Sequence, residues 1–87
     1  MTDQDFEEAV SKILFLASKD SSIMTGLPDV DLQDPQLRFV RVIEICEKIE
    51  LLRKSAPDRY DWYLRLSSSD VKKELAWHWA NRRVPKR

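Results

Sequence analysis

A long apolar helix with a proline at each end is the feature that most restricts this fold. Asp34 followed by Pro35 is a typical helix start, because the carboxylate caps the first turn and proline fits the first helical position. Pro57 cannot continue a helix, so we expect this one to run over residues 35–55. Apolar side chains cover about half of its circumference, which predicts a central place in the core. They are Phe39, Val42, Ile43, Ile45, Cys46, Ile49 and Leu52.

Three further segments show helical periodicity. Residues 3–18 place apolar side chains every three or four positions, and acids fill the first turn, where the helix dipole favours them. Residues 57–66 form a shorter helix that three serines end, and a last helix spans about 69–82. The chain holds one glycine, which disfavours a sheet with many tight turns. We therefore predict an all-α bundle of four main helices that forms a single domain over residues 1–87.

The segment between the first two long helices is irregular. Residues 19–34 contain Gly26 and Pro28 as breakers and have room for one short helical turn. Phe15 does not fit the apolar stripe of the first helix, because at about 100° per residue it points nearly opposite Phe6. We expect the apolar residues of the loop to cover the Phe15 ring. These residues are Ile23, Met24, Leu27, Val30 and Leu32.

The charge is unevenly spread although the net charge is zero. Residues 1–34 hold two lysines against eight acids, a net charge of −6, and residues 35–87 carry the compensating +6. Residues 84–87 are predicted to be a flexible basic tail, because Pro85 ends the helix. This asymmetry has two interpretations: solvated helix ends that suit the helix dipole, or a basic patch for phosphate or for an acidic protein.

The chain lacks the residue patterns that catalysis or metal binding would need. One cysteine and one histidine exclude a disulfide framework and a Cys/His zinc site. Cys46 lies on the apolar face of the central helix, and we expect it and His78 to be structural rather than nucleophile and base. The acids around Asp31 lack the glycine and the glutamate of a calcium loop. We expect no enzymatic activity, no cofactor and no metal.

The predicted location is cytoplasmic. The N-terminus is acidic where a secretory signal is basic, and the longest apolar run is far too short to span a membrane. A lone cysteine also suits a reducing compartment. We therefore expect no contact with membranes.

The aromatic residues near the C-terminus exceed what one small core needs. Tyr60 and Tyr63 share one helix face and Trp62 lies opposite, while Trp77 points away from the apolar stripe of the last helix. Either the loop or the chain end folds over these two tryptophans, or they form a contact surface. On the second interpretation, the candidate partner-binding residues are Trp62, Trp77, Arg59, Arg65, Lys73, Asn81, Arg82 and Arg83.

These features predict a protein-interaction module without catalytic activity, such as an adaptor, regulator, inhibitor or small subunit. It would dock through its last two helices on another protein or on a second copy of the chain. The alternative is a nucleic-acid-binding protein, because residues 57–87 have the outline of a helix-turn-helix with basic side chains at its C-terminal end. The acidic first third and the zero net charge favour a protein partner.

Removing residues 84–87 should leave the fold intact, because the segment contains one apolar side chain that could be buried. The free energy of unfolding, measured in urea, should change by less than about 0.5 kcal/mol. If the chain binds nucleic acid, the same deletion should weaken that binding and flatten its salt dependence. A larger loss of stability would show that the tail packs on the domain.

Overall fold

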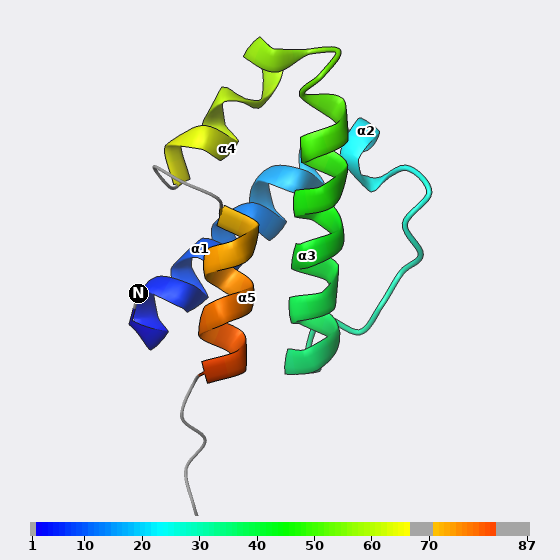
Figure 1. Cartoon of the computed structure of the whole chain (residues 1–87). Coiled ribbons are helices and arrows are strands. Elements are labelled where there is room, and N and C mark those ends of the chain that lie inside the picture. Colours follow the sequence, from blue (N-terminus) through cyan, green and yellow to red (C-terminus); the bar gives the residue numbers. More distant parts are fainter. Residues whose placement is uncertain (1, 67–70, 82–87) are drawn as a thin grey trace, which may run out of the picture.

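Five α-helices and one 3-10 turn make up the regular structure of residues 2–66 and 71–81, which are the residues that the computed structural model describes (Figure 1). In chain order they are α1 (Asp3–Ser18), α2 (Ser21–Met24), α3 (Pro35–Leu52), the 3-10 turn η1 (Pro57–Tyr60), α4 (Asp61–Leu66) and α5 (Val71–Asn81). The predicted all-α class is therefore confirmed. α3 is the central helix, as its pattern predicts, and it contacts α1, α2 and α5.

The helices are arranged around α3 on three sides. α5 runs antiparallel beside α3, and α1 crosses behind the pair (Figure 1). A loop formed by residues 25–34 descends from α2 along the side of α3 that faces away from α5 (Figure 1). α5 thus covers one side of α3, and the loop of residues 25–34 covers the other.

The predicted starts of the two longest helices, α1 and α3, are correct because each depends on a local cap. The hydroxyl of Thr2 accepts a hydrogen bond from the Asp5 backbone N–H (3.1 Å), and the Asp5 carboxylate accepts one from the Thr2 N–H (3.2 Å). Asp34 accepts hydrogen bonds from the backbone N–H groups of Gln36 and Leu37. These side chains satisfy N–H groups that have no partner inside the helix.

Two helix ends differ from the prediction. α3 ends at Leu52 rather than at residue 55, because the Leu52 carbonyl accepts hydrogen bonds from the N–H groups of Ser55 and Ala56 and from the Ser55 hydroxyl. The segment 57–66 is not one helix but a 3-10 turn followed by α4. The predicted bounds of the last helix, 69 and 82, lie outside the described residues, within which α5 spans Val71–Asn81.

Aromatic rings join the three longest helices. Phe39 of α3 stacks on Trp79 of α5, with ring centroids 4.6 Å apart and planes 4° apart. Phe6 of α1 lies against both rings and also stacks on His78 at 4.8 Å. Aliphatic residues and two tyrosines fill the rest of the core between the helices. The largest side chains that are fully buried are Ile13, Ile23, Ile45, Ile49, Tyr60 and Leu75.

The expectation that the loop covers Phe15 is wrong. The Phe15 ring stays 60% exposed, and the nearby cation is Lys19, whose ammonium lies 5.0 Å from the ring centre. The loop instead follows α3, where Lys48 donates a hydrogen bond to the Thr25 carbonyl (3.2 Å) and Arg41 donates one to the Pro28 carbonyl. Hydrogen-bond donors on α3 therefore fix the path of the loop, and its apolar residues follow that path.

Replacing Ile45 or Ile49 by alanine should destabilise the fold by about 2–5 kcal/mol, because each side chain is fully buried and would leave a cavity. Urea unfolding midpoints measure this loss. Val40→Ala on the exposed side of α3 is the matched control, and it should cost less than about 1 kcal/mol. Equal effects at the buried and the exposed positions would contradict the described core.

Candidate interaction surface

α5 has two chemically different faces. Val71, Leu75 and His78 are buried against α1 and α3, and Trp79 is half-buried beside them. The opposite face is exposed and contains Lys73, Ala76, Trp77, Ala80 and Asn81, which we call the α5 outer face. These positions are three or four residues apart, so they lie on one side of the helix.

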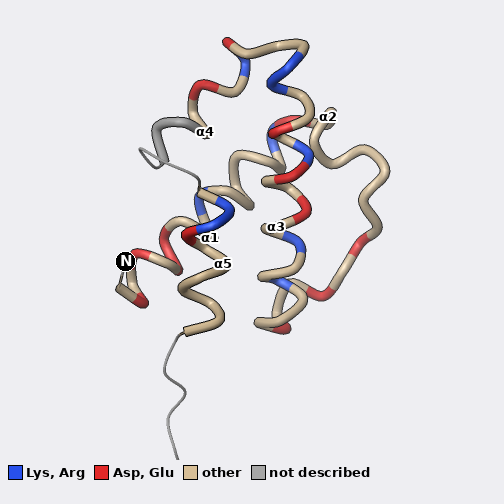
Figure 2. Tube along the Cα trace, in the orientation of Figure 1, with Lys and Arg blue, Asp and Glu red and all other residues tan. Residues whose placement is uncertain are grey.

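Trp77 is the centre of the α5 outer face. Its side chain is 67% exposed, and the alanines at positions 76 and 80 leave its ring standing above its neighbours. Lys72, Lys73 and Glu74 are the charged residues of α5, and all three belong to its first turns (Figure 2). The C-terminal half of the outer face, around Trp77, is therefore uncharged.

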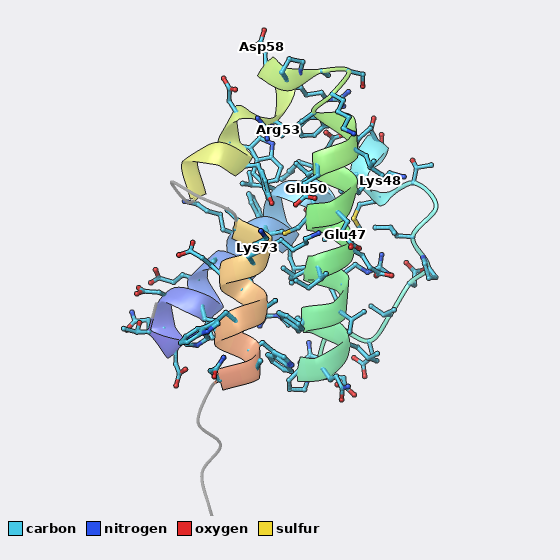
Figure 3. The ribbon with its side chains drawn as sticks, viewed as in Figure 1. Glu47, Lys48, Glu50, Arg53, Asp58 and Lys73 are labelled. Carbon is cyan, nitrogen blue, oxygen red and sulfur yellow. The ribbon has the colours of Figure 1, made fainter. Side chains whose placement is uncertain are left out.

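Contacts on the inner face hold α5 in place. The His78 Nε2 atom lies 3.0 Å from a carboxylate oxygen of Asp3, and the His78 ring stacks on Phe6. At the other end of α5, the Lys72 ammonium lies 3.7 Å from a carboxylate oxygen of Glu47 and 3.6 Å from one of Glu50. Figure 3 labels these two glutamates on α3. Both ends of the helix are tied to neighbouring helices, so the α5 outer face is presented on a fixed support.

The structure separates the two tryptophans that the sequence groups together. Trp62 is half-buried and packs on the core, with its ring edge against Tyr63 at a centroid distance of 6.2 Å. Trp62 is therefore less exposed than Trp77, and it does not lie on the α5 outer face. α4 also lies beyond the N-terminal end of α5 (Figure 1), whereas Trp77 belongs to the second half of that helix.

Of the arginines predicted to bind a partner, the structure describes the side-chain contacts of Arg59 alone. Arg59 pairs with Asp20 at 2.8 Å, and its guanidinium lies 5.8 Å from the centre of the Tyr60 ring. Arg65 belongs to α4, and its side chain lies outside the described part of the structure, as do Arg82 and Arg83 altogether. Of the predicted set, Lys73, Trp77 and Asn81 are the residues that the structure brings together, and Asn81 donates a hydrogen bond to the Trp77 carbonyl (2.8 Å).

Cys46 and His78 occupy structural positions. Cys46 is fully buried in the core, and this burial raises the pKa of its thiol to about 12. A thiol with so high a pKa is a poor nucleophile at neutral pH. Among the residues described, no group of three His, Cys, Asp or Glu side chains gathers to hold a metal ion. None of the described helices has the length and apolar character that crossing a membrane requires.

Sequence reasoning missed three features of the structure. Ala76 was not included in the predicted surface, because a small residue indicates a contact site only when a large exposed ring is known to lie beside it. The exposure of Phe15 was missed because it depends on the path of the loop. Arg41 was also missed: it interrupts the apolar pattern of α3 and is nevertheless only 2% exposed. A charged residue flanked by core positions on both sides is the signal that could have identified it.

Comparisons with known proteins give no relative from which a function could be transferred. No family model matches the chain, and neither the curated proteins nor the solved structures contain a significant match. A function must therefore be inferred from the residues and contacts of this chain alone.

Native Cys46 should react with a thiol reagent at pH 8 at least about a hundredfold more slowly than in the urea-unfolded chain, because burial suppresses its thiolate. Absorbance of the released chromophore measures both rates. Since the pKa rises from 9.0 to about 12 on folding, the contribution of the neutral thiol to stability is complete below pH 9 and falls between these values. Similar rates in the native and unfolded protein would contradict the burial.

Proposed function

We propose that this chain is a non-enzymatic protein-interaction module that docks through the α5 outer face. The observation that carries the proposal is the 67% exposure of Trp77 on a helix whose opposite face is locked into the core. Tryptophan is enriched among the residues that dominate binding energy in protein interfaces. A partner would be another protein or a second copy of the chain.

The surroundings of Trp77 support a docking role. Ala76 and Ala80 flank the ring on the same face, so a partner can approach the helix backbone closely and surround the ring. Lys73 and Asn81 provide a polar rim at either end of this apolar strip. An apolar centre with a polar rim is the usual anatomy of a protein interface.

The charge distribution favours a protein over a nucleic acid. Nucleic-acid recognition needs several free cations in one place to neutralise phosphates. On α5 the lysines occupy the first turn, and Lys72 lies near two glutamates of α3. Arg82 and Arg83, on which the nucleic-acid alternative depends most, lie outside the described residues. We therefore keep a protein partner as the proposal.

Trp77→Ser should abolish binding while changing the free energy of unfolding by about 1 kcal/mol or less, because the ring makes little use of the core. The measurement is sedimentation velocity of the full chain for self-association, together with cross-linking from native lysate for another protein. The matched control is Phe15→Ser, which removes an equally exposed ring from α1 and should leave association unchanged. An equal loss of association in both variants would indicate nonspecific hydrophobic association rather than a specific docking site.

Salt and nuclease treatment separate the two partner classes. Docking through Trp77 should persist between about 50 and 200 mM salt, whereas phosphate contacts weaken steeply over that range. Nuclease treatment should leave capture of the partner unchanged. If Trp77→Ser retains full association in sedimentation and in cross-linking, the α5 outer face is not the docking surface.

A further inference from the structure

A pocket of about 130 Å³ lies on the side of α3 that faces away from α5. Its walls come from α1, α2, α3 and the loop of residues 25–34, which descends along this side of α3 (Figure 1). The lining is mostly aliphatic, with Leu14, Met24, Pro28, Val30, Leu32 and Ile45. Apolar pockets of this kind are where small ligands bind when a few polar groups are also present.

Arg41 is the cation in this pocket, and its hydrogen bonding is incomplete. The side chain is only 2% exposed, and arginine cannot lose its proton at any ordinary pH. One terminal nitrogen donates to the Pro28 carbonyl, and Nε lies 3.6 Å from the Glu44 carboxylate. The other terminal nitrogen, Nη1, is buried and has no acceptor among the described residues. A buried charge that lacks full pairing is costly, so an added acceptor would stabilise it.

We propose that this pocket binds a small monocarboxylate with an apolar tail of about five or six carbons. A carboxylate matches the guanidinium fork in charge and shape, and it would join or replace the Pro28 carbonyl as the acceptor. The tail length follows from the volume, because an apolar cavity of about 150 Å³ holds one benzene molecule. The aliphatic walls then take up the tail.

Asp29 adds a restriction on the ligand. This exposed acid also belongs to the pocket lining, and Glu44 lies near the same guanidinium. A ligand with a second carboxylate would have to place that charge unpaired beside these acids or the aliphatic wall, which is costly. A ligand with an amine has no acceptor for the N–H groups of Arg41. The pocket should therefore select one negative charge at one end of an uncharged chain. This site shares no residue with the α5 outer face, so the two proposals can fail separately.

The test uses four six-carbon probes on the full chain: hexanoate, hexanol, hexylamine and adipate. Methyl NMR should show saturable shifts with hexanoate at Leu14, Val30 and Ile45, with a dissociation constant on the order of 1 mM for so small a ligand. Hexanol should bind about tenfold or more weakly, because it lacks the charge-assisted hydrogen bond. Hexylamine and adipate should cause no saturable shift. Equal binding of hexanoate and hexanol, or no saturable shift with hexanoate, would overturn the proposal.

Two variants locate the effect. Arg41→Met should weaken hexanoate binding by about tenfold or more and leave hexanol unchanged, and the buried position should accept the apolar side chain. Val30→Trp fills the pocket from the loop and should block both probes, so the test survives if Arg41→Met does not fold. Phe15→Ser, outside the pocket, should change neither. Unchanged hexanoate binding in either pocket variant would contradict the assignment.

Discussion

The stack of Phe39 on Trp79 determines how the three long helices meet. It joins α3 to α5 in almost parallel ring planes, and Phe6 brings α1 onto the same rings. Aromatic pairs of this geometry contribute about 0.5–1.5 kcal/mol beyond the area that they bury. Because Trp79 faces inward, Trp77, two positions earlier, must point to the other side of α5. The exposure of the candidate docking residue is thus a consequence of the core.

The sequence predicts those parts of the fold that depend on neighbours along the chain. Thr2, Asp34 and Pro35 define helix starts through contacts within four residues, so α1 and α3 begin where expected. The Phe15 ring was expected to lie under the loop but is exposed, because its exposure depends on the path of the loop and not on its neighbours in α1. The candidate surface was predictable in part, since helical periodicity places Trp77 with Lys73 and Asn81. It does not reveal which of two off-face tryptophans the rest of the fold covers.

Neither the composition of the chain nor the helical periodicity of its apolar residues predicts that Arg41 lies on the core side of α3. Its burial depends on a loop carbonyl and on one acid a turn away, and neither is apparent before the loop is placed. α3 therefore has two functions in the fold. It supports α5 on one side, and on the other it holds an irregular loop against a cation, which leaves an open space between them.

The contact between Asp3 and His78 joins residues 75 positions apart, near the two ends of the described chain. Synthesis is directional, so α1 and α3 leave the ribosome well before the residues that cover Phe6 and Phe39. Until α5 follows, the nascent chain exposes the ring faces of Phe6 and Phe39 that His78 and Trp79 cover in the folded protein. The protein is therefore most open to misassociation before α5 has left the ribosome, and a message truncated before residue 71 would yield a product without the rings that cover Phe6 and Phe39.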